Sequence, residues 1–395
     1  MPGQFEQFYA HVLADISLQE KLRESGDVER FAALLVKVGR ECGFAFNIDD
    51  VSAGMHARLP LVKGLVDSTI RETPLPPKGW LPIRASWHDG ELYLHWSYFG
   101  DQRLREPFFE GDVQRANFKP FNRLFRYTTP IAKLGNWLQE HPDPRPNGFI
   151  FHMSRCGSTL VSQMLAAVAH NVVISEADPI DAVVRAREVR PDLSEDQHAL
   201  WLSWMIGALG QRRGGDESNY FIKLDSWHSL ALPLFRRAFP DVPWIFIYRN
   251  PVEVLVSQMR MPGLHMIPGM LGSGQFGINL FDSLKNREDY CARVLAAICA
   301  PVLRQYSKDK ALLVDYRQLP HAVWTAILPH FGVEYSDSDR TAMAEAARYD
   351  AKTPSFEFAP DTETKQRDAT AGVRAAAGAR LVDLYRQLEV LRLGG

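Results

Sequence analysis

The sequence predicts an α/β protein with a mostly parallel central sheet flanked by helices, together with a small all-α N-terminal domain and a β-hairpin insert. Three observations support this prediction. Apolar residues recur at helical spacing before residue 58. Alternating apolar residues flank Asp89-Gly90, a typical hairpin turn. From residue 146 onward, apolar runs of strand length alternate with longer helical runs, as in a parallel sheet with helical crossovers.

The composition is that of an ordinary globular protein, with 46% apolar and 23% charged residues. A length of 395 residues accommodates more than one domain. The formal net charge of −2 argues against nucleic acid as a general partner, which would need a basic face. It leaves room for a local anion site, because a few arginines in a cleft hardly change the total.

The cysteines form no CxxC pair and no metal-type cluster, so we expect free thiols in a reducing compartment and no bound metal. They are Cys42, Cys156, Cys291 and Cys299. The N-terminal residues carry acids early and lack the apolar core of a secretion signal. No stretch approaches the roughly 20 apolar residues of a membrane span. These features predict a cytoplasmic protein.

Residues 1–58 are expected to form a small helical domain. Two amphipathic runs are separated by Ser25-Gly26-Asp27, and a third helix is expected to begin at Asn47-Ile48-Asp49. The segment resembles the Nif11-type helical domain in its phenylalanine-containing first helix, its LQEKL element (18–22) and its closing GFAF (43–46). The resemblance implies docking of a peptide or protein. The alternative is a helical extension packed on the main domain.

Residues 59–145 are expected to contain a linker and an aromatic β-hairpin packed on the main domain. The linker is proline-rich toward residue 79, and the hairpin follows at 80–100. Its aromatic side chains would form either a platform for an acceptor molecule or part of a core.

Residues 146–395 are expected to form the α/β domain. We expect strands at 148–153, 171–175, 220–224, 244–249 and 311–316. We expect helices at roughly 158–169, 178–188, 194–210, 229–238, 251–260 and 282–306. The intervening segment 261–280 is rich in Gly and Pro and is expected to be a mobile loop.

The most informative stretch is a buried strand that runs through residues 154–159 into an apolar helix. Such a junction directs backbone N–H groups and the helix dipole at an anion. Arg155 would add a charged hydrogen-bond donor, Gly157 would allow close approach, and Ser158 and Thr159 would donate hydroxyl hydrogen bonds. The segment therefore predicts a phosphate-binding loop.

Other phosphate-binding and catalytic loops fail on particular residues. A Walker A loop needs lysine where this chain has Ser158. A phosphatase loop starting at Cys156 would need arginine at 162, where the chain has Ser162. The GxSxG elbow and the GxGxxG fingerprint are both absent from this stretch.

A second segment follows about 90 residues later, at 221–260. It has a lysine-bearing strand (Lys223), a helix ending near Phe239-Pro240, a strand ending in Arg249-Asn250-Pro251, and Ser257 in the next helix. Arg249 would lie at a strand's carboxyl end, where ligands bind in open α/β sheets. Together with Arg155-Cys156-Gly157-Ser158-Thr159, this segment resembles the sulfotransferase superfamily that uses 3'-phosphoadenosine-5'-phosphosulfate (PAPS). The resemblance covers about residues 146–370.

The resemblance implies a P-loop-like three-layer α/β/α fold and transfer of a sulfuryl group from PAPS to a hydroxyl or amine, with 3'-phosphoadenosine-5'-phosphate (PAP) as product. It implies donor contacts from residues 155–159, and contacts to the 3'-phosphate from Arg249 and Ser257. In the superfamily a basic segment near residues 348–370 often closes over the nucleotide, which makes Lys352, Lys365 and Arg367 candidates. This chain lacks the RKGxxGDWK run of the cytosolic branch.

The chemistry needs fixed cations where negative charge builds up, and a general base for the acceptor. Arg155 and Lys223 are the candidate cations. Glu176, after the second strand of the domain, is the preferred base, with His228 as the main alternative and Asp225 as a third. His265 is a candidate substrate contact.

Two other classes of function stay open at this point. One is a P-loop-like kinase or nucleotide hydrolase, disfavoured by the missing lysine and by the lack of a clear strand ending in a magnesium-binding Asp. The other is a non-catalytic binding module. The acceptor, whether a small molecule, a sugar or a peptide, is not readable from the residues, and neither is the oligomeric state.

Overall fold

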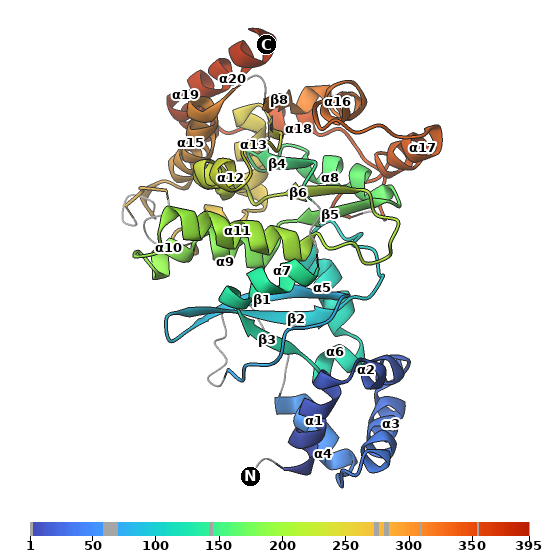
Figure 1. Ribbon diagram of the computed structural model, residues 1–395. Coiled ribbons are helices and arrows are strands. Elements are labelled where there is room, and N and C mark those ends of the chain that lie inside the picture. Colours follow the sequence, from blue (N-terminus) through green and yellow to red (C-terminus); the bar gives the residue numbers. More distant parts are fainter. Residues whose placement is uncertain are drawn as a thin grey trace. The chain divides into compact units, whose positions relative to one another are not determined.

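The computed structural model describes residues 3–57, 70–141, 145–271, 276–279, 284–307, 310–353 and 355–394 (Figure 1). The chain divides into two compact units. Unit 1 comprises Met1–Pro144 and Ala177–Gly215, and unit 2 comprises Arg145–Glu176 and Asp216–Gly395. Residues 60–69 of the linker predicted at 60–79 lie outside the described residues.

Unit 1 begins with the expected helices: α1 (Gln4–Ala14), α2 (Ile16–Arg23), α3 (Val28–Glu41) and α4 (Ile48–Ala57). The first amphipathic run divides into two helices because the Asp15 carboxylate caps α2, accepting hydrogen bonds from the backbone N–H groups of Ser17 and Leu18. Gly43 has a φ of +86° after α3, as a left-handed helix cap requires. The arrangement is compatible with the Nif11-type resemblance, which stays a prediction.

The predicted hairpin is confirmed as β1 (Trp80–His88) and β2 (Glu91–Tyr98). Asp89 and Gly90 both have positive φ, at 48° and 79°, as a tight two-residue turn requires. A third strand, β3 (Tyr127–Pro130), pairs antiparallel with β2, in the order β1-β2-β3. This strand was not predicted, because four residues are too few to show an alternating pattern.

Several hairpin aromatics are core residues. Trp80, Trp96 and Phe99 are buried, which favours the core interpretation over an open platform. The helical bundle joins this core through buried polar contacts: Gln19 Nε2 donates to the Tyr127 hydroxyl at 2.8 Å, and that hydroxyl donates to the carbonyl oxygen of Leu13.

The other described helices of unit 1 pack around the antiparallel sheet, with α9 against β1 and α11 against α7. They are α5 (Phe109–Asn117), α6 (Pro120–Leu124), η1 (Ile131–Lys133), α7 (Leu134–Glu140), α9 (Asp178–Val184), α10 (Ala186–Val189) and α11 (Glu195–Leu209). The one helix expected at 178–188 is therefore two. The helices at 177–215, which the sequence analysis places within the α/β domain, belong to this compact unit.

Unit 2 is built on a five-stranded parallel sheet in the order β5-β6-β4-β7-β8. The strands are β4 (Gly148–His152), β5 (Asn171–Ser175), β6 (Asn219–Lys223), β7 (Trp244–Tyr248) and β8 (Ala311–Asp315). All five strands predicted for the α/β domain are confirmed. They are almost completely buried, as expected for continuous apolar runs covered on both faces.

Helices flank this sheet, so the predicted fold class is confirmed (Figure 1). The helical elements up to β8 are α8 (Ser158–Ala167), η2 (Ser226–Ala231), α12 (Leu232–Ala238), α13 (Pro251–Arg260), η3 (Leu264–Met266) and α15 (Arg287–Gln305). Those after β8 are η4 (Tyr316–Gln318), η5 (Val323–Ile327), α16 (Leu328–His330), α17 (Asp337–Ala346), α18 (Thr362–Arg367), α19 (Ala371–Arg380) and α20 (Val382–Gly394). No helix among the described residues is long and apolar enough to cross a bilayer.

Candidate functional site

The carboxyl ends of the parallel strands bring the predicted site residues to one edge of the sheet. Glu176 follows β5, Lys223 ends β6, Arg155 lies in the loop after β4, and Arg249 follows β7. Strand β4 lies between β6 and β7, so its loop separates the lysine from the second arginine. Open α/β sheets bind ligands at this edge, where the strand order reverses.

The loop after β4 has an unusual backbone. Ser154 and Arg155 have φ values of 79° and 51°, in a region that non-glycine residues rarely adopt. Two side chains hold Ser154: its N–H donates to His152 Nδ1 at 3.1 Å, and Gln258 Nε2 donates to its hydroxyl at 2.9 Å. Backbone strain kept in place by such bonds is typical of functional loops.

Arg155 is half-buried, and its Nη2 donates to the carbonyl oxygen of Met261 at 2.6 Å. The Cys156 thiol is buried and donates to the Ile247 carbonyl oxygen at 3.0 Å, and burial raises its pKa to about 12. The Cys156 side chain is therefore part of the core, and only the backbone of this residue is suited to an anion.

Gly157 is the position where the loop needs glycine. Its φ is +88°, and a Cβ there would lie 2.8 Å from a methyl carbon of Leu319. Ser158 and Thr159 form the first turn of α8, so the loop ends at a helix N-terminus. Helix α8 packs on β5 and β6, which holds this N-terminus at the sheet edge.

Glu176 and Lys223 form an ion pair, with Lys223 Nζ 2.5 Å from Glu176 Oε1. The lysine side chain has no exposure, whereas the glutamate side chain is 23% exposed. Burial raises the pKa of Glu176, but the Lys223 ammonium and the hydrogen-bonded His152 outweigh it, so this pKa lies well below its ordinary value. Glu176 also has a positive φ of 54°, and its N–H donates to the Lys223 carbonyl oxygen.

His152 links this pair to the loop. Its Nδ1 accepts the Ser154 N–H, so the proton sits on Nε2, which donates to the Leu224 carbonyl oxygen at 2.9 Å and lies 3.5 Å from Glu176 Oε1. Burial lowers the pKa of His152, which keeps the ring neutral.

Two further charged or polar groups belong to this neighbourhood. Lys352 is exposed as a residue, but burial of its ammonium and the nearby cations Arg155 and Lys223 lower its pKa to about 8. His265 is buried with its Nε2 3.4 Å from the Ser226 hydroxyl, and burial lowers its pKa to about 3. We call Glu176, Lys223, His152, Arg155 and Lys352 the Glu176 cluster.

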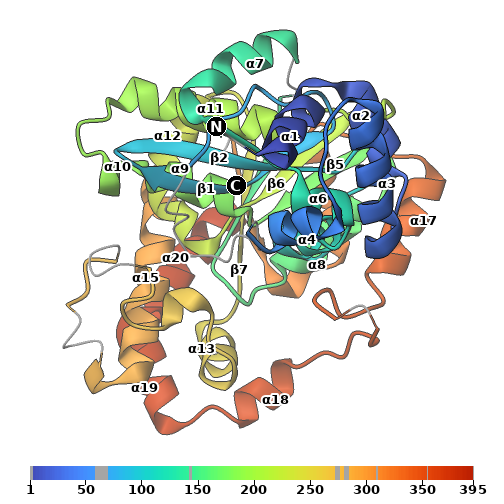
Figure 2. The same cartoon turned by 90° about the horizontal axis from the view of Figure 1, so that it is seen from below.

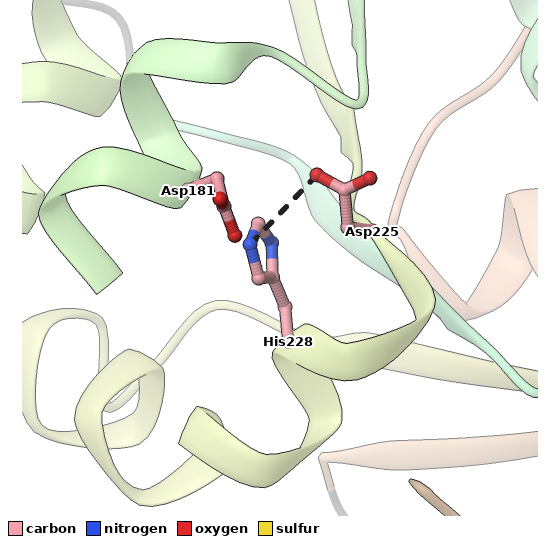
Figure 3. A group of neighbouring side chains, drawn as sticks. All are labelled: Asp181, Asp225 and His228. Carbon is pink, nitrogen blue, oxygen red and sulfur yellow. Dashed lines mark ion pairs between the residues drawn. The ribbon is translucent and has the colours of Figure 1, made fainter. Parts of the chain in front are cut away.

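His228, the second candidate base, lies in the interior of the protein. It has no exposure, its ring packs against Trp227 and Phe235, and its Nε2 is 3.8 Å from Asp225 Oδ2 (Figure 3). Asp225 is also buried. An acceptor group would have to displace packed side chains to reach His228.

Arg249 lies in a second group of charges, which we call the Arg249 cluster: Arg249, Glu253, Asp361, Thr362 and Lys365. Arg249 Nε donates to Glu253 at 2.6 Å and Nη2 donates to Asp361 at 2.7 Å. Asp361 also pairs with Lys365 at 2.6 Å. The guanidinium stacks on the Tyr316 ring, 3.8 Å from its centroid.

Helix α18, which begins beside Asp361, packs against α13 (Figure 2). Glu253, one turn after Arg249 on α13, accepts hydrogen bonds from Thr362 and from Gln366. The predicted phosphate contact Ser257 is a further turn along α13 and is half-buried. Lys365 is buried, and burial lowers its pKa against the opposite effect of Asp361.

The structure thus gathers most predicted residues into two clusters at one edge and leaves His228 apart in the core. Four further residues of the two clusters were not predicted from the sequence: His152, Tyr316, Glu253 and Asp361. Only His152 carried a signal, as a titratable residue that ends a fully apolar strand. The arrangement suits a ligand with two anionic groups, because each cluster contains cations. The N-terminus of α8, which ends the loop that contains Arg155, adds a further site for an anion.

Comparison with known proteins gives a match over residues 146–337 to the model of the sulfotransferase family. Among solved structures, the chain is similar to sulfotransferase STF1 of Mycobacterium tuberculosis H37Rv, with 17% identity over 54% of this chain and 75% of that chain, and a TM-score of 0.35. It is also similar to the sulfotransferase domain of the Synechococcus PCC 7002 olefin synthase, with 20% identity, 64% and 96% coverage, and a TM-score of 0.38. No curated protein matches the chain significantly.

Proposed function

Because residues 146–337 match the model of the sulfotransferase family, we propose that this protein transfers a sulfuryl group from PAPS to a hydroxyl or amine of an acceptor. The single observation that supports this proposal best is that Arg155 and Arg249, from segments far apart in the sequence, follow the carboxyl ends of two adjacent parallel strands. A donor with a phosphosulfate at one end and a 3'-phosphate at the other needs two cationic sites around one phosphate-binding loop.

The residues present fit such a donor. The loop 155–159 and the α8 N-terminus would hold the 5'-phosphosulfate, with Arg155, Lys223 and Lys352 as cations. Arg249, Ser257 and Lys365 would hold the 3'-phosphate. The buried Cys156 side chain would take no direct part.

We assign the general base to Glu176. In the transfer, the acceptor oxygen or nitrogen forms a bond to sulfur while the bond from sulfur to the bridging phosphate oxygen breaks. The acceptor proton passes to a Glu176 carboxylate oxygen, and Arg155 and Lys223 stabilise the negative charge on the leaving phosphate.

The Glu176–Lys223 pair bears on the strength of this base. A carboxylate paired with an ammonium at 2.5 Å binds protons weakly. A sulfonate near Lys223 would share that ammonium, so the pKa of Glu176 would rise toward its ordinary value when the donor is bound. The base would then be strongest when it is needed.

Substitution of the two candidate bases separates their roles. Glu176→Gln should retain PAP binding but lower turnover by about 10²–10⁴-fold, as loss of a general base does. His228 is fully buried, so His228→Phe should keep much of the turnover if the protein folds. Near-normal turnover in Glu176→Gln together with an inactive His228 variant would transfer the role to the histidine.

Ligand-induced thermal stabilisation tests the proposal against its alternatives. PAP should raise the unfolding temperature, and ATP with magnesium should not, because the loop has Ser158 where a Walker A loop has lysine. Stabilisation by ATP alone would favour a kinase or nucleotide hydrolase. PAP binding without sulfuryl mass gain on any acceptor class would favour a non-catalytic module, with residues 1–58 as its docking part.

A further inference from the structure

The Arg249 cluster is electrically balanced without any ligand. Arg249 and Lys365 supply two positive charges, and Glu253 and Asp361 supply two negative charges. Arg249 is therefore already neutralised at the place where the proposed function requires it to bind a phosphate. A dianionic phosphate cannot simply join this group, because it would lie beside two carboxylates.

The two carboxylates differ in their freedom to leave. The Glu253 side chain is only 7% exposed and lies on α13, one turn from Arg249. The Asp361 side chain is 42% exposed and lies just before α18. Asp361 can therefore turn into solvent, where water replaces the hydrogen bonds that it loses, whereas the Glu253 carboxylate has little access to water.

We propose that the Asp361 carboxylate occupies the binding site of the donor's 3'-phosphate when no donor is bound, and that this phosphate displaces it from Arg249 and Lys365. Asp361 thereby determines how strongly the protein discriminates between nucleotides with and without a 3'-phosphate. The proposal rests on the proposed function, and it adds a residue that is not a phosphate ligand itself.

The exchange requires little movement of the chain. Thr362 and Gln366 both donate to Glu253, at 3.3 and 3.1 Å, so α18 stays attached to α13 when Asp361 turns away. Displacement of Asp361 frees one Nη2 hydrogen bond of Arg249 and the ammonium of Lys365. Both can then donate to phosphate oxygens in place of the carboxylate oxygens they lose.

A nucleotide without the 3'-phosphate would leave the pair between Arg249 and Asp361 intact. Its binding would not depend on Asp361, because no anion competes for Arg249. Only a 3'-phosphate has to break the existing pair. Loss of the Asp361 charge should therefore strengthen PAP binding selectively.

The test is titration calorimetry of the full chain with PAP and with adenosine 5'-monophosphate. Asp361→Asn should strengthen PAP binding by about tenfold or more, since one charge-assisted hydrogen bond is typically worth that much. Binding of adenosine 5'-monophosphate should stay within about twofold of the wild-type value. The matched control is Asp368→Asn. It removes an exposed carboxylate that lies seven residues after Asp361 and pairs with Arg260, and it should change neither affinity.

A second variant keeps the proposal testable if Asp361→Asn folds poorly. Lys365→Gln should weaken PAP binding by about tenfold and leave adenosine 5'-monophosphate binding unchanged, because the freed ammonium serves only the 3'-phosphate. An unchanged or weakened PAP affinity in a folded Asp361→Asn protein would overturn the proposal, as would equal gains for both nucleotides. If the wild-type protein binds PAP no better than adenosine 5'-monophosphate, the proposed function fails instead.

Discussion

Replacement of Glu176 by glutamine should destabilise unit 2 as well as lower turnover. Lys223 has no exposure, and Glu176 is its partner at 2.5 Å. Loss of one partner from a buried ion pair typically costs about 3–5 kcal/mol. We expect about 3 kcal/mol, at the lower end of that range, because Glu176 is 23% exposed and water can partly replace its carboxylate.

The effect should be readable in thermal unfolding followed by circular dichroism. For a unit on the order of 200 residues, about 3 kcal/mol corresponds to a decrease of about 6–12 °C in the unfolding temperature. Glutamine keeps the side-chain length of glutamate and faces the same positive φ at this position. The loss should therefore report the charge and not the backbone.

The pair of substitutions gives an internal control. Lys223→Met should cost less than Glu176→Gln, because a partly exposed carboxylate stays hydrated while a buried ammonium does not. The double variant should recover most of the stability but none of the turnover. Unfolding of Glu176→Gln at the wild-type temperature would contradict this expectation, as would a double variant that is less stable than both single variants.

The remaining predictions concern the loop, the pH dependence and the thiols. Gly157→Ala should weaken PAP binding by at least about tenfold, measured by calorimetry, and lower the free energy of unfolding by about 1–3 kcal/mol, measured by denaturant unfolding. The reason is that Gly157 has a φ of +88° and a Cβ there would meet Leu319. Wild-type values would show that the loop adapts. The pKa of Lys352 is lowered to about 8, so PAPS binding should weaken as the pH rises through about 8. This loss of affinity at high pH should disappear in Lys352→Met. The same loss in that variant would show that Lys352 does not contact the donor. Because folding lowers the pKa of Glu176, the Glu176–Lys223 pair should stabilise the protein above the ordinary glutamate pKa of about 4.3, and this stability should be lost as the pH falls below that value. If this is wrong, the wild type and the double variant with Glu176→Gln and Lys223→Met would unfold at the same acidic pH. Iodoacetamide should label mainly Cys42 in the folded protein and all four cysteines after unfolding, because Cys156, Cys291 and Cys299 are buried; rapid labelling of Cys156 would contradict its pKa of about 12.

The sequence was sufficient to predict the parallel strands because each is a short, continuous apolar run. The strand expected at 148–153 is Gly148–His152, and the one expected at 171–175 is Asn171–Ser175. Helix α13 begins at Pro251, because proline is favoured in the first turn of a helix. These features are local, so the order of residues is enough to reveal them.

Features that depend on distant partners could not be predicted. Asp361 contacts Arg249 across 112 residues of chain, and no periodicity connects them. Glu176 and Lys223 were predicted separately, as base and cation, but their ion pair across two strands was not. The helices at 177–215 were expected in the α/β domain, although they cluster with the antiparallel sheet. Membership of a compact unit depends on packing, which apolar spacing does not specify.

The position of β4 in the middle of its sheet has a consequence for synthesis on the ribosome. Its two neighbours, β6 and β7, are encoded later, and β7 ends only at Tyr248. At about 5–20 residues per second, the strand GFIFH emerges several seconds before either partner exists. An apolar strand with two open edges invites association with other nascent chains. We therefore expect newly made protein to need holdase chaperones until residue 248 has emerged, and cellular yield to be more sensitive to slow translation between residues 153 and 243 than elsewhere.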